Sequence, residues 1–350
     1  MNVLQEIPAL NKEIGDQVRS YINQLTKPVG SLGRLEEIAI ELAEMTASPF
    51  PSVTPPGVIV FAADHGVAKE GVSAYPQEVT AQMVLNFLNG GAAINVFSRQ
   101  IGAKFTVVDV GVATDLKGEG LISKKVRYGT ENFCEKDAMS IEEAKQAVAI
   151  GYEQAEAMIT GGIKCLIVGE MGIANTTASS TILALLSGKE IESLVGKGTG
   201  IPDEKLAHKR DVIQRALSAR NPDVNDPLDI LSKVGGLEIA AMAGAMLAGA
   251  SHRIPILVDG FICSVAALIA KLFNPRVVDY MILGHRSKES GHQVAIDMLG
   301  KQPLLDLGMR LGEGSGAAVA FPLLQFATKM LSEMATFSSA QISNRHDPSL

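Results

Sequence analysis

Short apolar runs alternate with longer amphipathic stretches along most of the chain. Five such runs, rich in branched side chains and ending in glycine or polar residues, lie at residues 57–62, 105–110, 165–168, 256–258 and 277–283. Each is followed by a stretch with helical periodicity. Because the runs are mostly continuous in their apolar character, we expect both faces of each predicted strand to be buried. The pattern predicts an α/β fold in which a mainly parallel sheet is flanked by helices.

The two ends of the chain follow a different pattern, which is typical of helices. Residues 3–47 predict two helices joined by a glycine-rich turn, and residues 317–339 predict one long helix. We expect these helices to pack together as a small helical domain built from residues 1–51 and 306–350. The α/β substrate-binding domain would then span residues 52–305.

Polar residues gather where the predicted strands end. In a parallel sheet the carboxyl ends of the strands share one edge, and ligands bind in the crevice beyond it. We therefore expect all five strand exits to face one rim. These exits carry Asp64 and His65, Asp109, Glu170, Asp259, and His285 with Ser287.

Glu313 is the single acidic residue in the sequence RLGEGSGAA at residues 310–318. The flanking glycines allow tight turns and the close approach of a ligand, and the apolar run that follows predicts a helix beginning near Ser315. The positive end of that helix favours the ionised carboxylate unless burial outweighs it. Two interpretations stay open, since Glu313 could be a proton acceptor or could only complement the helix dipole.

The sequence GEMGIANTTAS at residues 169–179 leaves a predicted strand and enters a predicted helix. Its polar groups would therefore face the crevice and suit a polyhydroxylated ligand. Glu170 and Gly172 lie at the strand exit, and Asn175 and Thr176 follow. Either Asn175 or Thr176 could instead be only the N-cap of the helix.

The sequence GKGTGIPD at residues 196–203 offers backbone amides that could cradle a phosphate. Gly198 and Gly200 lie in this loop, and Lys209 on the following predicted helix could add a positive charge. For Lys209, a solvated helix face is the default alternative. The loop lacks the final glycine of a dinucleotide fingerprint and the ending of a P-loop, so we reject both motifs.

Composition limits the class of protein and its partners. The chain has 350 residues, 47% of them hydrophobic, and a net charge of −7 with no basic block, so nucleic acid is not expected as a partner. The most apolar window, residues 239–250, is too short for a membrane span and predicts a buried helix. The first 16 residues do not resemble a signal peptide, and three widely spaced cysteines suggest no disulfide framework. We expect a soluble cytoplasmic protein with no membrane partner.

Four motifs together carry a family resemblance. They are KPVGSLGRLE at residues 27–36, ADHGV at 63–67, GEMGIANTT at 169–177 and LGEGSGAA at 311–318. In this order and spacing they resemble the nicotinate-nucleotide:dimethylbenzimidazole phosphoribosyltransferases of cobalamin biosynthesis, over residues 25–321. The second proline of the first family motif is Val29 here, a change confined to a turn.

The resemblance implies an activity and an architecture. The phosphoribosyl group of nicotinate mononucleotide would be transferred to 5,6-dimethylbenzimidazole, giving α-ribazole 5′-phosphate and nicotinate with inversion at the sugar carbon. It also implies a homodimer with a Rossmann-like sheet, and neither a cofactor nor a metal. Glu313 matches the proton acceptor of the family.

Substrate-binding residues are implied by the same matching. Glu170 would lie near the ribose, and Gly198, Gly200 and Lys209 would hold the phosphate. The remaining matches are Gly172, Asn175 and Thr176 in the mononucleotide pocket, Ser287 as a further contact to the mononucleotide, and Gln82 and Leu311 at the benzimidazole.

Two other function classes remain as alternatives. Asp64, His65, His285 and His292 could gather a metal in a hydrolase of phosphorylated sugars, although their spacing matches no metal motif. Alternatively, the chain could be a non-catalytic binder of a nucleotide or vitamin precursor. No nucleophile-elbow pattern surrounds Ser287 or Ser315, so covalent serine catalysis is not expected.

Overall fold

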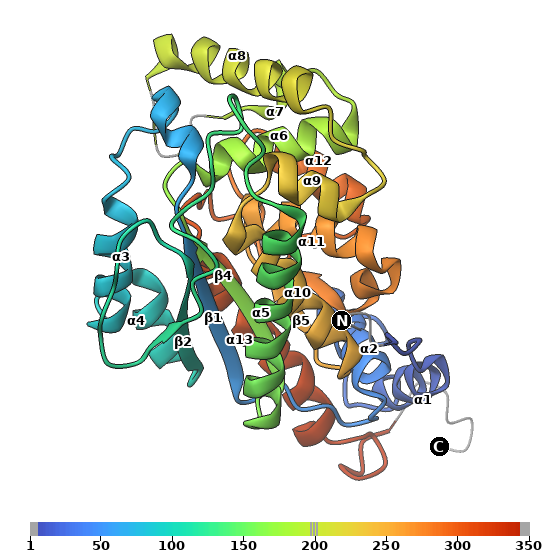
Figure 1. Ribbon diagram of the computed structural model, residues 1–350. Helices are drawn as coiled ribbons and strands as arrows, with labels where there is room; N and C mark the ends of the chain where they lie inside the picture. Colours follow the sequence, from blue (N-terminus) through green and yellow to red (C-terminus); the bar gives the residue numbers. More distant parts are fainter. Residues whose placement is uncertain (1–5, 197, 199, 201, 344–350) are drawn as a thin grey trace.

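The computed structural model describes residues 6–196, 198, 200 and 202–343 (Figure 1). The described strands form one six-stranded sheet in the order β3-β2-β1-β4-β5-β6, and every neighbouring pair is parallel. This confirms the predicted α/β fold. The strands are β1 (Pro56–Ala63), β2 (Lys104–Gly111), β3 (Leu121–Ser123), β4 (Cys165–Met171), β5 (Ile256–Val258) and β6 (Met281–Leu283).

Helices connect the strands and form both ends of the described chain. They are α1 (Lys12–Ile22), α2 (Arg34–Thr46), η1 (Gly66–Glu70), α3 (Val79–Leu88), α4 (Ala93–Gln100), α5 (Ile141–Thr160), α6 (Asn175–Ser187), α7 (Ile191–Leu194), α8 (Asp203–Arg220), α9 (Pro227–Val234), α10 (Leu237–Ser251), α11 (Phe261–Phe273), η2 (Pro275–Tyr280), α12 (His292–Leu299) and α13 (Ser315–Glu333), where η denotes a 3₁₀-helix.

Helices cover both faces of the sheet, as the unbroken apolar runs predict. Every residue of β1 is buried. In β4, a Cβ added to Gly249 of α10 would lie 3.3 Å from the side chain of Leu166, and one added to Gly314 would lie 3.3 Å from that of Ile167. Since successive side chains of a strand point to opposite faces, α10 and the turn before α13 lie on opposite sides of β4 (Figure 1).

The strand order places a crevice between β1 and β4. From β1 the chain first runs to β2 and β3 on one side, and it later continues with β4, β5 and β6 on the other side. The connections on the two sides of such a switch point leave the sheet in opposite directions, which opens a space beyond the carboxyl ends of the strands. The strand exits nearest this point are therefore the best placed to hold a ligand.

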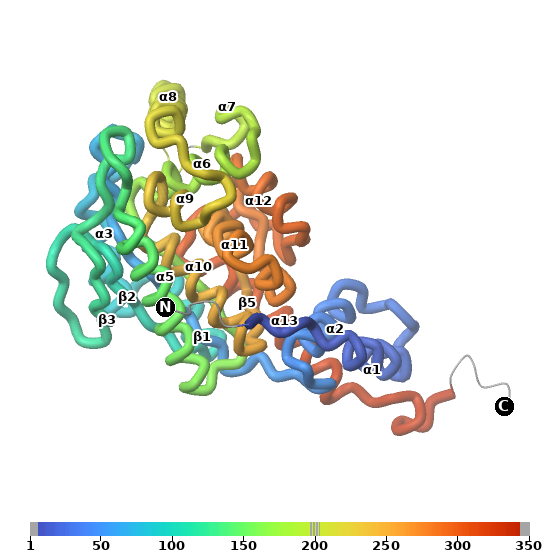
Figure 2. Tube along the Cα trace, turned by 45° about the vertical axis from the view of Figure 1, so that its right-hand side comes forward, coloured from blue at the N-terminus to red at the C-terminus, as the bar shows by residue number. Residues whose placement is uncertain are grey.

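Segments from both ends of the chain lie side by side. Leu25 forms an antiparallel bridge with Thr336, and the Thr26 amide donates to the Ala335 carbonyl at 3.0 Å. Figure 2 shows α1, α2 and the end of α13 grouped together, away from the sheet. These contacts agree with a small helical unit, while its division from the α/β part at residues 51–52 and 305–306 stays a prediction.

Some element predictions were wrong in detail. Of the strand expected at residues 277–283, only β6 is extended, because Pro275–Tyr280 forms the 3₁₀-helix η2. Strand β3 was not predicted, since its three residues are partly exposed and carry no apolar run. The helix expected over residues 317–339 begins at Ser315 and ends at Glu333.

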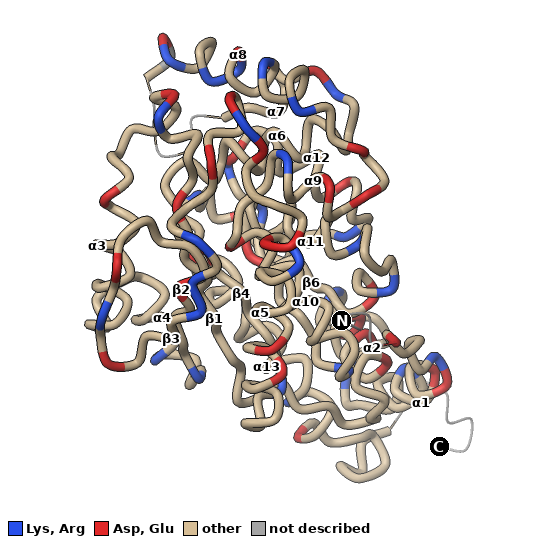
Figure 3. Tube along the Cα trace, in the orientation of Figure 1, with Lys and Arg blue, Asp and Glu red and all other residues tan. Residues whose placement is uncertain are grey.

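The interior and the surface agree with the composition. Residues 237–250 of α10 are all buried, which confirms the predicted core helix. All three cysteines are unpaired thiols. No helix in the described ranges combines the length and apolar character that a membrane crossing requires. Basic and acidic residues are interspersed along the chain, and α8 carries both (Figure 3).

Candidate active site

A cavity of about 670 Å³ lies at the carboxyl ends of β4, β5 and β6. The β4 exit contributes Glu170, the β5 exit Asp259, and the β6 exit His285 and Ser287. Residues 310–313 form another part of the wall. The cavity therefore joins the predicted strand exits to the predicted glutamate turn.

Because all the described strands are parallel, their exits do share one edge of the sheet, but the exits of β1 and β2 do not line this cavity. The Asp64 carboxylate accepts a hydrogen bond from the Ala113 amide at 2.8 Å, and His65 Nε2 lies 2.6 Å from Glu238 Oε1. Asp109 accepts from the Gly111 amide at 3.0 Å. These polar groups bond to neighbouring loops and to Glu238, and they are not among the lining residues of the cavity.

Glu313 lies in a strained turn directly before α13. Its φ is +65°, between Gly312 at +95° and Gly314 at +86°. A non-glycine residue with positive φ is uncommon, and such residues often mark functional sites. Asp259 anchors this segment. Its carboxylate accepts hydrogen bonds from the Gly314 amide at 3.2 Å and from the Ala317 amide, in the first turn of α13, at 2.9 Å.

Glu313 is 7% exposed, and its Oε2 atom has no hydrogen-bond partner within the described structure. Burial raises the pKa of Glu313 to about 6, the nearby Ile94 amide opposes this shift, and the charge of Asp259 adds to it. Burial thus outweighs the helix dipole that was expected to favour ionisation. The carboxylate is still mostly ionised at neutral pH.

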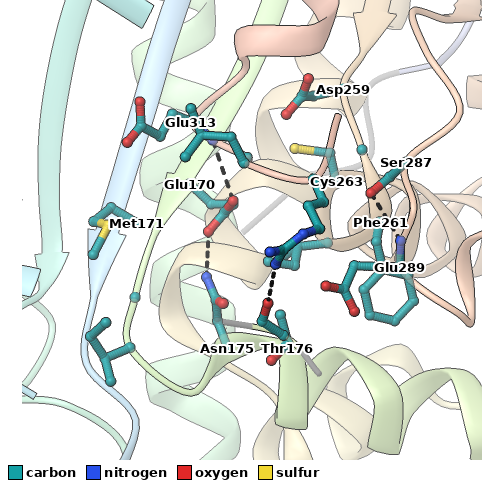
Figure 4. Close-up of a pocket in the computed structure, with 18 of the residues that line it drawn as sticks. Glu170, Met171, Asn175, Thr176, Asp259, Phe261, Cys263, Ser287, Glu289 and Glu313 are labelled. Carbon is teal, nitrogen blue, oxygen red and sulfur yellow. Dashed lines mark hydrogen bonds between the residues drawn. The ribbon is translucent and has the colours of Figure 1, made fainter. Parts of the chain in front are cut away.

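Glu170 lies between Glu313 and Asn175 (Figure 4). Its carboxyl group accepts hydrogen bonds from the Asn175 side-chain amide and, at 3.4 Å, from the Glu313 backbone amide. Burial, with the charges of Glu238 and Asp259, raises the pKa of Glu170 well above its ordinary value, although these two hydrogen bonds oppose the shift. Its environment therefore favours the protonated acid.

Asn175 and Thr176 are not the N-cap of α6, so that alternative was wrong. The N-cap is Ala174, whose φ is +75°. The Asn175 side chain contacts Glu170, and the Thr176 hydroxyl accepts a hydrogen bond from Lys209 Nζ at 2.9 Å. Both side chains are therefore available to the cavity, and both line it.

The glycine loop before α8 is described only in part. Gly198 lines the cavity, Gly200 does not, and Lys197, Thr199 and Ile201 lie outside the described residues. Lys209 is 1% exposed and lies behind Thr176, and burial lowers its pKa to about 8. Lys209 is therefore a buried cation next to the loop, which excludes a solvated helix face.

Ser287 lines the cavity and is held by a neutral histidine. The Ser287 amide donates to His292 Nδ1 at 2.7 Å, so this nitrogen carries no proton. The other nitrogen, Nε2, then donates to the Ser264 hydroxyl at 3.0 Å. Burial, with the neighbouring His285, lowers the pKa of His292 to about 4. His292 therefore orients the Ser287 loop as a neutral ring.

Of the two residues expected at a benzimidazole, the structure brings Leu311 to the cavity but not Gln82. Gln82 is exposed on α3, whereas Val79 and Met83 of the same helix line the cavity. At about 100° per residue, the Gln82 side chain leaves the helix about 60° from that of Val79 and about 100° from that of Met83, toward the exposed side. The apolar spacing of Val79 and Met83 was the signal that could have found the cavity-lining face.

Several lining residues were not predicted as site residues. Tyr75, Asp259, Glu289 and Arg310 belong to this group. Asp259 was noted only as a strand exit, and Arg310 only as the start of the glycine motif. No group of three or more His, Cys, Asp or Glu side chains suited to a metal ion occurs among the residues that the structure describes.

The fold and the site together are typical of an α/β enzyme whose cavity lies beyond the carboxyl ends of a parallel sheet. The model of the family described as phosphoribosyltransferase matches residues 7–342, so the chain belongs to the phosphoribosyltransferase family.

Relatives narrow the branch of this family. The chain is 51% identical to a nicotinate-nucleotide–dimethylbenzimidazole phosphoribosyltransferase from Chloroflexus aggregans, over 98% of each chain. It is 50% identical to the protein of the same name from Halalkalibacterium halodurans, over 97% of this chain and 96% of that one. A crystal structure of this enzyme from Thermus thermophilus superposes with a TM-score of 0.91 at 45% identity, covering 96% of this chain and 100% of that one. The resemblance inferred from the four motifs is confirmed.

Proposed function

We propose that the protein transfers the phosphoribosyl group of nicotinate mononucleotide to 5,6-dimethylbenzimidazole, giving α-ribazole 5′-phosphate and nicotinate. The names of relatives that match nearly the whole chain support this reaction over hydrolysis of a sugar phosphate. The observation that carries the proposal is the buried Glu313 carboxylate, which has an unpartnered oxygen and lines a cavity of about 670 Å³. This volume is within the range of small-molecule sites.

The reaction requires one base. One ring nitrogen of the benzimidazole attacks the sugar carbon while the bond from that carbon to the pyridinium nitrogen breaks, and the bonding electron pair neutralises the pyridinium. The leaving group therefore needs no proton. The second ring nitrogen of the benzimidazole carries a proton that becomes acidic as positive charge builds up, and Glu313 accepts it. A well-placed general base contributes about 10²- to 10⁴-fold in rate.

Alignment of the two substrates supplies most of the remaining acceleration. The apolar side chains of Val79, Met83, Met171 and Leu311 suit the fused ring of the benzimidazole. Glu170 and Asn175 suit the ribose, because a protonated acid and an amide can both donate to sugar oxygens. Gly172 lines the cavity and lets the β4 exit pack against the end of β1, because an added Cβ would lie 2.4 Å from the Ala63 carbonyl oxygen.

The phosphate of the mononucleotide would lie near the glycine loop that precedes α8. Amides of Gly198 and Gly200, the Thr176 hydroxyl and the buried Lys209 support this position, and Ser287 would contact the mononucleotide from the β6 exit. Gly200 would contribute through its amide and not through the cavity wall.

A single assay tests the proposed reaction and its base. Pure protein is incubated with nicotinate mononucleotide and dimethylbenzimidazole in the presence of a chelator, and α-ribazole 5′-phosphate is measured by chromatography. We expect product from the unmodified protein, and a Glu313→Gln variant that still binds the mononucleotide but turns over at least about 10²-fold more slowly. Near-normal turnover of Glu313→Gln would remove the assigned base. Loss of wild-type activity on chelation would favour the metal-dependent alternative.

A further inference from the structure

Asp259 lies where the exit of β5 meets the turn that carries Glu313, and both residues line the cavity (Figure 4). The Oδ2 atom of Asp259 accepts a hydrogen bond from the Gly314 amide, and its Oδ1 atom accepts one from the Ala317 amide. Both amides belong to the start of α13, where backbone N–H groups have no partner within the helix. One fully buried carboxylate therefore binds two of these groups from a neighbouring strand.

The Glu313 turn packs closely on the sheet. A Cβ added to Gly169 of β4 would lie 2.1 Å from the Glu313 carbonyl oxygen, and one added to Gly316 would lie 2.0 Å from Cδ2 of His285. These contacts prevent the turn from moving toward the sheet, while the hydrogen bonds to Asp259 keep it from moving away. The positive φ of Glu313 is unfavourable for a residue with a side chain and persists only where the surroundings hold it.

Asp259 also places a negative charge beside the candidate base. After the larger effect of burial, this charge contributes to the raised pKa of Glu313, which the Ile94 amide of α4 opposes. A second carboxyl group, Glu170 of β4, accepts from the Glu313 amide, and His285 Nε2 of the β6 exit lies 3.5 Å from Asp259 Oδ1. The other ionisable groups near Asp259 are Cys263 of α11 and His292 of α12.

We propose that Asp259 is a positioning residue for the transfer, because its carboxylate holds the Glu313 turn at the cavity and places a fixed negative charge beside the base. This assignment rests on the proposed function. Asp259 acts through Glu313 and does not touch the reacting atoms. An ionised carboxylate is required for this role, since each of its oxygens accepts one backbone N–H, whereas an amide side chain has a single acceptor oxygen.

The first test compares Asp259→Asn with a matched control, Asp109→Asn. Asp109 is also buried and accepts from two backbone amides, those of Gly111 at 3.0 Å and Val112 at 2.9 Å, but it is not among the described residues that line the cavity. Each substitution breaks one of two such hydrogen bonds, so both proteins should lose stability. We expect kcat to fall by about 10- to 100-fold in Asp259→Asn alone, with KM for nicotinate mononucleotide within about threefold of the wild type.

The dependence on pH separates the charge of Asp259 from its hold on the turn. Asp259→Asn removes a charge that raises the pKa of Glu313, so the acid limb of kcat/KM should move below its wild-type position near pH 6. A protein with lactic acid in place of Ala317, made by nonsense suppression, has an ester oxygen instead of the N–H that Asp259 binds. Its kcat should fall while the acid limb stays in place. In a Glu313→Gln background, both changes should alter kcat by less than about twofold, because they act through Glu313.

Each contrary result has its own meaning. A higher KM with unchanged kcat in Asp259→Asn would make Asp259 a contact of the mononucleotide and overturn the proposal. An equal fall in kcat in the wild-type and Glu313→Gln backgrounds would also overturn it, because the effect would then not pass through the base. If Asp259→Asn does not fold, the lactic acid variant decides, and a normal kcat there counts against the proposal.

The proposed function and the role of Asp259 can fail separately. A wild-type protein that forms no α-ribazole 5′-phosphate would overturn the proposed function. The Glu313 carboxyl group can still be titrated by ¹³C NMR in glutamate-labelled protein, with Glu313→Gln assigning its resonance. We expect Asp259→Asn to lower the pKa of this group and Asp109→Asn to leave it in place. A Glu313 titration that is the same in Asp259→Asn and the wild type would overturn the assignment of Asp259.

Discussion

At the scale of single residues, two buried ionisable groups set how the site should depend on pH. Glu313 has its pKa raised to about 6, mainly by burial, and must be deprotonated to accept a proton. Lys209 has its pKa lowered to about 8 by burial and must be protonated to attract a phosphate. Both groups are in their active forms only between these two values.

We therefore expect kcat/KM to fall below about pH 6 and above about pH 8, and the alkaline loss to appear as a rising KM for nicotinate mononucleotide. Steady-state kinetics from pH 5 to 9 would check this. In Glu313→Gln, the residual kcat/KM should no longer fall below about pH 6 through the enzyme, so that only protonation of the substrates affects it on the acid side. In Lys209→Met, the alkaline rise in KM should disappear. An acid limb that is the same in Glu313→Gln and the wild type would show that another group titrates there.

The sequence was informative about site residues where small residues frame a polar one. Glu313 and Glu170 both lie beside glycine at the end or start of an element, and the structure brings both to the cavity. Gln82 is exposed outside the cavity lining, and its role at the benzimidazole stays a prediction, because its motif does not reveal the phase of a helix. Arg310 was overlooked because the direction of a side chain across a cavity depends on the opposite wall, which comes from a distant part of the chain.

At the scale of elements, helices α5 and α10 cross with their backbones in contact. A Cβ added to Gly151 would lie 1.8 Å from the Ala241 carbonyl oxygen, and one added to Gly244 would lie 1.9 Å from the Val148 carbonyl oxygen. Each helix thus has a glycine where the other helix presents a carbonyl. This contact holds α10 at the distance that lets its buried residues pack on the sheet.

Gly151→Ala should destabilise the protein, although helix propensity alone would favour alanine at this position. Propensity alone predicts stabilisation by up to about 1 kcal/mol, whereas the clash with α10 should destabilise the protein by about 1–3 kcal/mol. Denaturant unfolding measures the difference. Gly161→Ala, at the C-cap of the same helix, is the control, because there an added Cβ meets nothing closer than 3.2 Å. A Gly151→Ala protein as stable as the wild type would mean that the helices separate at little cost.

Strand positions were predicted best where an apolar run was not accompanied by a turn-forming residue such as proline. The β1 and β2 segments are largely apolar and were placed within about a residue or two. The segment before β6 contains apolar residues too, yet Pro275 and the Asn274 side chain that accepts from the Arg276 amide favour a 3₁₀ turn there. In the segment before β6 only Val277 and Tyr280 are buried, so its apolar residues indicated contact with the core but could not distinguish a strand from a 3₁₀ turn.

At the scale of the whole molecule, the strand order could not have been deduced from the apolar runs. The runs predict strands and their burial, but the order β3-β2-β1-β4-β5-β6 depends on which connections cross which face. All five predicted exits do lie at one edge of the parallel sheet, but which three of them line the cavity could not be predicted without the strand order. The family resemblance supplied what the pattern lacked, namely the identity of the two substrates.

The resemblance also suggests an assembly. We propose that the protein acts in the cytoplasm as a homodimer, on the basis of the family likeness and of exposed apolar side chains such as Val29, Phe50 and Phe326. Sedimentation should then give a mass of twice 36.9 kDa. A monomer at micromolar concentration would contradict the dimer and leave the catalytic proposal unaffected.

The pairing of α2 with α13 has a consequence for biosynthesis. Helix α2 ends at Thr46, and its packing partner begins only at Ser315, so translation must proceed through the entire sheet before the two can meet. The early helices therefore emerge from the ribosome with their apolar faces uncovered, and a nascent chain can build the crevice walls well before it possesses the turn that completes them. A chaperone that binds the amino-terminal helices would protect the nascent chain from aggregation until α13 has been synthesised.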